Sequence, residues 1–378
     1  MMKLVTISHK RSLAPRPGTG RATTRIVTIS HKRCLGAFAL AFVVGALLVG
    51  CGGTEEQPTE VVLVTHDSFA ISDAVKEAFE KESGLTLRIL QAGDAGEIVT
   101  RALLTAGDPE GDVLFGVDNN LLQRALEGDV FEAYESPELA FVDPSLRLDP
   151  ENRATPIDRG DVCLNVDNGW YAKRGLEPPA QLEDLILTRY RGQLVIENPA
   201  TSTPGLAFLL ATIARLGDRW QEYWRELRAN GVLVVDGWEE AYYARFSGSA
   251  GGKGNRPIVV SYASSPPAEV IFRDPRPSEA PTGVVESSCF RQVELAGILR
   301  GARNEDGARK LIDFMLSKRF QEDIPLQMFV FPARTDAALP PEFEQFAVVP
   351  EQPLELPPEE IEENRARWVD EWTDIVIR

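Results

Sequence analysis

The order of apolar and polar positions along the chain predicts strands and helices in alternation. Apolar runs at 61–64, 85–90 and 113–117 are typical of strands. The segments 73–83, 97–106 and 119–126 have apolar residues at helical spacing, and Gly84 is placed to end the first helix. Alternation of this kind indicates an α/β fold with a parallel sheet.

The pattern returns in the second half of the chain. Strands are expected at 161–166, 194–196, 232–235 and 258–262, and helices near 182–187 and at 206–216, 218–229 and 238–246. A return segment at 292–299, an amphipathic helix at 306–316, a short apolar stretch at 329–332 and a terminal helix at 359–377 follow. Trp368 and Trp372 are expected to pack that last helix against the body. Two α/β units at this length predict two lobes with a cleft between them.

Polar residues follow the first three strands. Ligands of parallel sheets bind at the carboxyl ends of the strands. Those ends are expected at Thr65-His66-Asp67-Ser68, Gln91-Ala92-Gly93-Asp94 and Asp118-Asn119-Asn120. We therefore expect a ligand site at this edge.

A polar turn, 198–205, joins the strand at 194–196 to the helix that follows. Ser202 or Thr203 can cap this helix, and Pro204 suits its first turn. The free N–H groups and hydroxyls predict a seat for an anion such as a phosphate. The alternative is an ordinary helix cap that binds nothing.

Charge divides the chain unevenly. Eight of the 40 basic residues and none of the 57 acidic residues lie in residues 1–51, which leaves 32 basic against 57 acidic side chains downstream. Binding to nucleic acid or to an anionic membrane by charge is therefore not expected. The acidity is compatible with a cationic ligand.

The N-terminal segment has the features of a secretory signal. Lys32 and Arg33 precede an apolar run at 35–49, and Leu48-Val49-Gly50-Cys51 is similar to a lipobox, the motif cut before a lipidated cysteine. The run is shorter than the roughly 20 residues of a membrane span. We therefore predict a signal at 1–51, lipidation of Cys51 and a tether at 52–59. The heptapeptide at 5–11 recurs at 27–33 and leaves the translation start open.

Few residues remain for metal binding or catalysis after residue 51. His66 is the single histidine there, and Cys163 and Cys289 are the two cysteines, which in an exported protein can form a disulfide. His66, Asp67 and Ser68 are consecutive, so they cannot form a catalytic relay. The glycine-rich segment 248–255 lacks the phosphate-loop pattern. We expect a protein that is not an enzyme.

Two aromatic groupings suggest different ligands. Adjacent Tyr242 and Tyr243, with His66 and Asp94, are one possible set of ferric-iron ligands. Trp238 and Tyr262 lie at or just beyond strand ends, where they can stack on a flat cation, with Asp94 as its counter-charge. A polyamine is a further alternative.

Several spaced motifs resemble the periplasmic thiamine-binding proteins of bacterial ABC transporters. The similarity covers about residues 60–378. It is carried by 67–69, 116–122, 201–206, 237–242, 261–266, 292–294 and the pairs Phe320-Gln321 and Ile324-Pro325.

This resemblance implies a type II periplasmic-binding-protein fold with hinge strands. Lobe 1 is expected at 60–160 and 288–378, and lobe 2 at 161–287. It also implies a thiamine-type ligand (thiamine, its monophosphate or its pyrophosphate), no cofactor or metal, an ABC permease with its ATPase as partners, and a monomer anchored outside the cell membrane. The ligand-binding residues implied by the resemblance are Asp94, Ala95, Ser202, Thr203, Trp238, Tyr262, Ala263, Ser264 and Ser265. The polar strand ends add His66, Asp67, Ser68 and Asp118 to the predicted ligand-binding set.

The chain departs from the family at three positions. His66 and Ala268 stand where the family usually has tyrosines, and Phe329 corresponds best to a family tryptophan. Fewer aromatics leave the preferred thiamine species open. Because Cys163 and Cys289 fall on the two implied hinge strands, we predict a disulfide between them.

Overall fold

The computed structural model describes residues 59–378, so the predicted signal, Cys51 and most of the tether lie outside the described residues. The described residues belong to one compact unit. The strands are β1 (Glu60–Thr65), β2 (Thr86–Gln91), β3 (Val113–Asp118), β4 (Phe131–Glu132), β5 (Thr155–Asp167), β6 (Leu194–Glu197), β7 (Leu233–Val235), β8 (Ile258–Tyr262), β9 (Thr282–Leu299) and β10 (Phe331–Pro332). The α-helices are α1 (Asp73–Ser83), α2 (Ala95–Leu104), α3 (Leu122–Glu127), α4 (Asn168–Ala172), α5 (Thr203–Leu216), α6 (Trp220–Ala229), α7 (Pro266–Ile271), α8 (Glu305–Met315), α9 (Lys318–Gln327), α10 (Pro341–Phe346) and α11 (Pro358–Val376).

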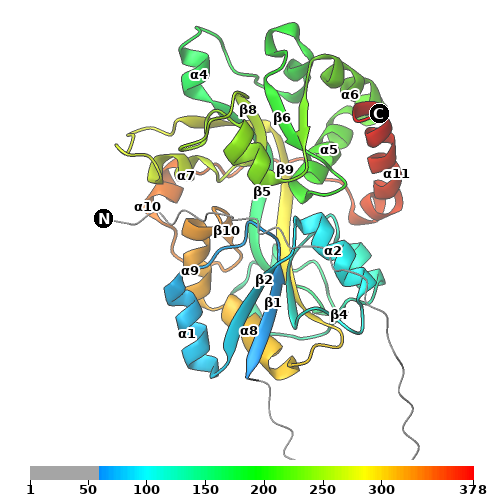
Figure 1. Ribbon diagram of the computed structural model, residues 1–378, viewed down its shortest axis with the longest axis vertical. Helices are drawn as coiled ribbons and strands as arrows, with labels where there is room; N and C mark the ends of the chain where they lie inside the picture. The colour runs from blue at the N-terminus through cyan, green and yellow to red at the C-terminus, as the bar shows by residue number, and fades with distance from the viewer. Residues whose placement is uncertain (1–58) are drawn as a thin grey trace, which may run out of the picture. The chain divides into compact units, whose positions relative to one another are not determined.

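These strands form one mixed sheet of order β2-β1-β3-β9-β5-β8-β6-β7, with β4 paired to β9 and β10 to β5. The groups β2-β1-β3 and β8-β6-β7 are each parallel, as predicted. The long strands β5 and β9 are antiparallel to each other and to their outer neighbours β8 and β3. Figure 1 shows them side by side through the middle of the fold, where they join the two parallel groups. The α/β class is confirmed.

Helix α5 lies at the centre of the second group of strands. All of its residues except Ala214 and Arg215 are buried. A helix that is apolar on every side must be covered on every side. This burial fixes the position of its N-terminal turn, which is the turn singled out in the sequence.

Helix α1 begins and ends where its sequence predicts. The Ser72 hydroxyl accepts a hydrogen bond from the Val75 N–H at 3.3 Å. Gly84 ends the helix with φ of 73°, a left-handed conformation that glycine adopts without a Cβ penalty.

Five segments differ from the sequence predictions. Strands β5 and β9 are longer than the predicted 161–166 and 292–299, because their extensions carry polar residues that the apolar pattern does not mark. The helix expected near 182–187 is a 3₁₀ turn, Leu182–Ile186, and the one at 238–246 contains a π-helical turn, Glu240–Arg245. Helix α9 was not predicted, since Pro325 lies within it.

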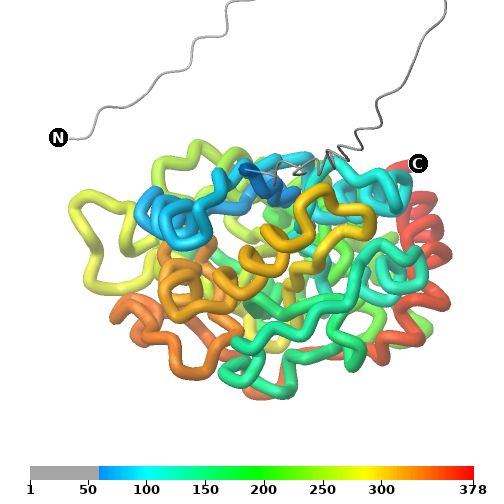
Figure 2. Tube along the Cα trace, turned by 90° about the horizontal axis from the view of Figure 1, so that it is seen from below, coloured from blue at the N-terminus to red at the C-terminus, as the bar shows by residue number. Residues whose placement is uncertain are grey.

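The terminal helix α11 packs as predicted against the body. Trp368 and Trp372 are both buried, and the Trp372 ring meets Trp224 of α6 edge-on, with ring centroids 5.6 Å apart. Figure 2 shows this red helix at the right of the view, with α9 and α10 in orange on the opposite side. Helix α11 contacts α6 and α3, and therefore elements of both predicted lobes. The lobe boundaries themselves stay a prediction.

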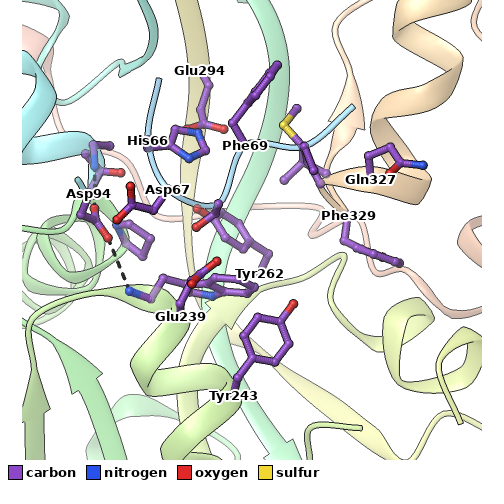
Figure 3. A pocket seen from close by; sticks show the side chains of 18 residues that line it. His66, Asp67, Phe69, Asp94, Glu239, Tyr243, Tyr262, Glu294, Gln327 and Phe329 are labelled. Atoms are coloured by element: carbon purple, nitrogen blue, oxygen red, sulfur yellow. Dashed lines mark hydrogen bonds and ion pairs between the residues drawn. The ribbon is translucent and has the colours of Figure 1, made fainter. Parts of the chain in front are cut away.

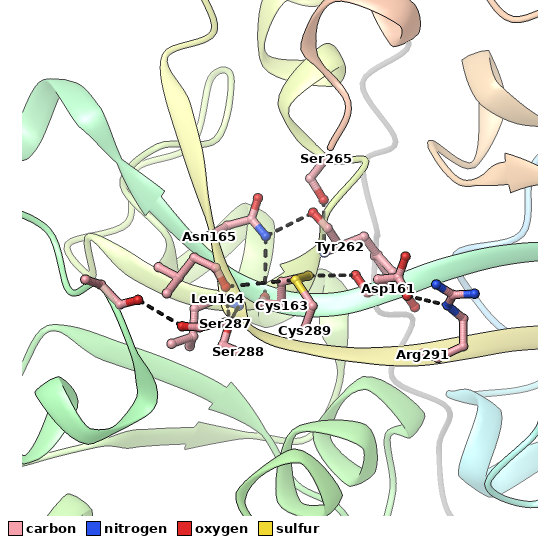
Figure 4. The surroundings of a disulfide bond; sticks show 12 residues. Asp161, Cys163, Leu164, Asn165, Tyr262, Ser265, Ser287, Ser288, Cys289 and Arg291 are labelled. Atoms are coloured by element: carbon pink, nitrogen blue, oxygen red, sulfur yellow. Dashed lines mark hydrogen bonds and ion pairs between the residues drawn. A yellow bond between two sulfur atoms is a disulfide. The ribbon is translucent and has the colours of Figure 1, made fainter. Parts of the chain in front are cut away.

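A disulfide joins the two central strands, and the predicted Cys163–Cys289 pairing is confirmed, with an S–S distance of 2.05 Å. The register between β5 and β9 shifts at this point, between Val162 and Leu164. Figure 4 shows the bond between the crossing strands, with Asp161 and Arg291 on one side and Ser288 on the other. The disulfide therefore fixes an irregular step in the strand pair that connects both parallel groups.

Candidate cleft site

A cavity of about 240 Å³ opens where both parallel groups of strands end. One wall comes from the segments after β1 and β2, and the other from the N-terminus of α5, the residues after β7 and the end of β8. A third side is formed by the segment between α9 and β10. Figure 3 shows the side chains converging from these elements. The lining residues are His66, Asp67, Ser68, Phe69, Ala70, Asp94, Ala95, Thr203, Pro204, Trp238, Glu239, Tyr243, Tyr262, Glu294, Gln327, Met328, Phe329 and Val330.

The charged lining is acidic. Asp67, Asp94, Glu239 and Glu294 line this cleft cavity, whereas no lysine or arginine does. Burial raises the pKa of Glu239, and the nearby Asp67 carboxylate raises it further. Carboxylates gathered in this way disfavour a further negative charge and favour a cation.

His66 lies among these carboxylates. Its Nε2 is 3.4 Å from Glu294 Oε1. Burial alone would lower the pKa of His66, but the carboxylates of Glu294, Asp94 and Asp67 raise it above its usual value. Gly116, with φ of 106°, makes room for the ring, since a Cβ there would lie 2.5 Å from His66 Cδ2.

Asp94 links the two walls. One carboxylate oxygen accepts a hydrogen bond from the Ala95 N–H at 2.7 Å, and the other accepts one from the Trp238 N–H at 3.4 Å. Burial raises the pKa of Asp94 to about 6, while His66 and these N–H donors oppose the shift. At neutral pH this side chain is therefore mostly a carboxylate.

Beneath the cavity, Asp158 and Glu294 are paired across β5 and β9. Asp158 is fully buried, and neither of its carboxyl oxygens has a hydrogen-bond partner among the described residues. Burial and then the Glu294 carboxylate raise the pKa of Asp158 well above its usual value. A negative charge on Asp158 is therefore disfavoured.

Aromatic rings line the other side. Trp238 stacks on Tyr242 with ring centroids 4.9 Å apart, and it is tilted against Tyr262 at 6.3 Å. The Trp238 Nε1–H donates to Ser261 Oγ at 3.0 Å, which fixes the indole. Gly160 makes room for Tyr262, because a Cβ there would lie 2.8 Å from Tyr262 Cδ1. A flat cation therefore meets preformed ring faces.

Eight predicted site residues line this cavity: His66, Asp67, Ser68, Asp94, Ala95, Thr203, Trp238 and Tyr262. The other five do not. Asp118 is buried and accepts hydrogen bonds from the Asn120 and Leu121 N–H groups. Ser265 Oγ bonds to Ser261 Oγ at 2.9 Å and accepts from the Tyr262 N–H, so it supports the rings from behind. Ala263 and Ser264 are buried beside it.

Ser202 departs from its predicted place. It lines a different cavity, on the far side of the α5 N-terminus, and its hydroxyl does not cap the helix. Thr203 Oγ1 accepts a hydrogen bond from Gln292 Nε2 at 3.1 Å. Thr203, whose O–H stays free to donate, is therefore the hydroxyl of the predicted anion seat that lines the cleft.

Sequence reasoning missed several lining residues. Glu239, Glu294 and Phe329 lay in recognised motifs or alignments but were given no ligand role. Tyr243 was considered only for iron, and Phe69, Ala70, Pro204 and the segment 327–330 were not selected as ligand contacts. Residues 327–330 show no helical or strand spacing of apolar positions, which would have drawn attention to them. Phe329 adopts a left-handed backbone conformation there, with φ of 57°.

The tyrosine pair does not have the geometry of an iron site. The Tyr242 hydroxyl donates to Glu269 Oε1 at 2.8 Å, and burial raises the pKa of Tyr242 well above its usual value. Tyr242 therefore stays a phenol. Within residues 59–378 no cluster of three or more histidine, cysteine or acidic side chains is arranged to hold a metal ion. No helix in that range has the length and apolarity to cross a membrane.

Comparison with known proteins agrees with this fold. Residues 108–354 match the family model described as bacterial extracellular solute-binding protein. The chain is 30% identical over 344 residues to the thiamine-binding periplasmic protein of Salmonella typhimurium. The aligned region covers 88% of this chain and 98% of that protein. A solved periplasmic thiamin binding protein superposes with a TM-score of 0.75 at 28% identity, over 86% of this chain and 98% of its own.

A more distant structure shows the fold alone. The ferric binding protein from Campylobacter jejuni superposes with a TM-score of 0.65 at 18% identity, over 84% of this chain and 99% of that chain. The type II periplasmic-binding-protein fold predicted from the sequence is confirmed. The chain belongs to the bacterial extracellular solute-binding proteins, in the group of thiamine-binding periplasmic proteins.

Proposed function

We propose that this chain captures thiamine in the cleft cavity and delivers it to an ABC permease without converting it chemically. The observation that carries the proposal is the pairing of an acidic wall with the Trp238 and Tyr262 rings. The thiazolium of thiamine is a flat cation, which suits ring faces and carboxylates together. The names of the related proteins support the same ligand.

Within the thiamine class, the charges favour the unphosphorylated molecule. A phosphate ester brings negative charge to a cavity lined by four carboxylates and no lysine or arginine. Thr203, the residue of the predicted seat that lines the cleft, offers a single hydroxyl donor against these carboxylates. We therefore rank thiamine above its monophosphate and its pyrophosphate.

The remaining parts of the proposal concern the cell. Cys51 carries the lipid anchor that holds the chain on the outer face of the membrane, and the protein works as a monomer with a permease and its ATPase. These statements rest on the lipobox-like sequence and on the resemblance.

Calorimetric titration of residues 52–378 with thiamine and both esters tests the ligand. We expect submicromolar thiamine binding, weaker ester binding, and at least about tenfold weaker thiamine binding in Trp238→Ala, since a desolvated cation–π contact contributes up to ~2 kcal/mol. Asp94→Asn should weaken thiamine more than the esters. Asp306→Asn, an exposed acid on α8, is the matched control.

Three outcomes separate the alternatives. Tighter binding of an ester than of thiamine would overturn the charge ranking. Spermidine binding without thiamine binding would indicate a polyamine carrier. A coloured complex with ferric citrate, lost in Tyr243→Phe, would indicate iron despite the Tyr242–Glu269 hydrogen bond.

A further inference from the structure

A second cavity lies on the opposite side of the α5 N-terminus from the cleft. Its volume is about 150 Å³. It is lined by the turn before α5, by α11, and by residues of α2 and α3, and Thr203 is the residue that it shares with the cleft cavity. Figure 1 shows α5, α11 and α2 on this side of the fold.

Two arginines from different helices line this second cavity. Arg124 comes from α3 and Arg365 from α11, and both are half-buried. Neither guanidinium forms an ion pair with an acidic side chain of residues 59–378, although most arginines in that range do form such pairs. The Nε of Arg365 is buried and has no hydrogen-bond partner there. Two unpaired guanidiniums beside one cavity disfavour each other unless an anion lies between them.

The charges around Arg365 agree with this picture. Burial and then the Arg124 charge lower the pKa of Arg365, and the carboxylates of Glu362 and Asp118 offset part of that effect. Asp370 also lines the cavity, at its exposed end. These acids lie close enough to moderate the positive charge but do not pair with it.

Ser202 supplies the independent sign of a ligand. The residue is 1% exposed, it lines the second cavity, and its Oγ has no hydrogen-bond partner among the described residues. Its proximity slightly lowers the pKa of Asp94, but no hydrogen bond of ordinary geometry joins the two. A buried hydroxyl without a partner costs free energy unless a ligand or water satisfies it.

The helix end completes the set of donors. The N–H groups of the first turn of a helix have no partner within it, and the helix dipole places partial positive charge there. Helix α5 has 14 residues, and its first turn begins with Thr203, Pro204 and Gly205, of which Thr203 and Gly205 have an N–H to donate and Pro204 has none. N-terminal N–H groups, a hydroxyl and two guanidinium forks are the donors that bind phosphate and sulfate in proteins.

We propose that the second cavity is a binding site for a small tetrahedral oxyanion such as inorganic phosphate, held by Arg124, Arg365, Ser202 and the α5 N-terminus. The anion joins α3 to α5 and α11, and it neutralises the two guanidiniums. This site is separate from the thiamine cavity, and it does not depend on which ligand the cleft takes.

The test is titration of residues 52–378 with inorganic phosphate at constant ionic strength, followed by calorimetry and by ³¹P line broadening. Saturation with thiamine beforehand occupies the cleft, so that phosphate held there is distinguished. We expect one saturable site. Arg124→Gln and Arg365→Gln should each weaken it at least about tenfold, because charge-assisted hydrogen bonds are among the strong ones.

Arg319→Gln is the matched control, since Arg319 is exposed on α9, away from this cavity. Circular dichroism and thermal unfolding confirm that each variant is folded. Ser202→Ala, which removes only the buried hydroxyl, should also weaken phosphate binding and should leave the protein folded. Absence of saturable binding in the unaltered chain, or binding in both arginine variants as tight as in the unaltered chain, would overturn the proposal.

Discussion

His66 Nε2 lies 3.4 Å from Glu294 Oε1, in a cavity whose other charged lining residues are Asp67, Asp94 and Glu239. His66 also lies against Phe115, with ring centroids 5.4 Å apart. Its charge depends on pH near neutrality, since the surrounding carboxylates raise the pKa of His66 above 6.5.

Thiamine affinity should rise with pH. Asp94, with a pKa of about 6, becomes a carboxylate as the pH increases, and His66 loses its proton through its raised pKa. Both changes favour a bound cation. Between pH 5 and pH 7.5 we expect roughly a tenfold gain from Asp94 alone. Titrations at several pH values measure it, with Asp94→Asn as the variant that should flatten the curve; an equally steep curve in that variant would contradict this assignment.

Stability of the unliganded protein should change with pH in the opposite direction. Burial raises the pKa of Asp118 from 3.8 to about 7, so the folded state binds a proton that the unfolded state releases above pH 3.8. The contribution of Asp118 to the free energy of unfolding is therefore fully present below pH 3.8 and is lost as the pH rises to about 7. His66 changes the stability in the same direction. Its contribution is present below pH 6.5 and is lost as the pH rises through the higher pKa that His66 has in the folded protein.

Thermal unfolding from pH 5 to pH 8 measures this slope. Asp118→Asn, which keeps the side-chain shape and one acceptor oxygen for the Asn120 and Leu121 N–H groups, should reduce it. A melting temperature that rises steadily over this range in the unaltered protein would show that other groups dominate.

Gly160→Ala should weaken thiamine binding by about tenfold or more while the protein stays folded. The new Cβ would lie 2.8 Å from Tyr262 Cδ1, closer than real Cβ contacts, so the ring must leave its place beside Trp238. Gly169→Ala is the matched control, because its Cβ would meet only Asp167 Oδ1 at 3.4 Å. Similar affinities in both variants would mean that the Tyr262 position does not matter for binding.

Loss of the disulfide should lower the free energy of unfolding by about 2–5 kcal/mol. Cys163 and Cys289 are 126 residues apart in sequence, so the bond restricts a long loop of the unfolded chain. Denaturant unfolding of the Cys163→Ala, Cys289→Ala double variant measures the change. Intact mass before and after reduction is the check on the unaltered protein, where a gain of two protons is required.

The sequence by itself determined the order of elements, the α/β class and the location of the polar strand ends. Local sequence patterns were sufficient wherever they were strong. Ser72 and Gly84 mark the two ends of α1 as expected, and apolar runs mark the short buried strands. The resemblance pointed to Trp238, Tyr262 and the Cys163–Cys289 pair, because these residues lie within or beside recognisable motifs.

The tertiary structure decided what each turn faces. Ser202 and Thr203 are neighbours in one turn, yet Thr203 lines the cleft and Ser202 does not, because the burial of α5 fixes the direction of that turn. Arg124 and Arg365 are 241 positions apart, and the packing of α11 against α3 brings them beside one cavity. Glu294 reaches His66 because the long strand β9 runs antiparallel beside β3, with Glu294 opposite Asp118, a relationship between distant segments that no local pattern of residues records.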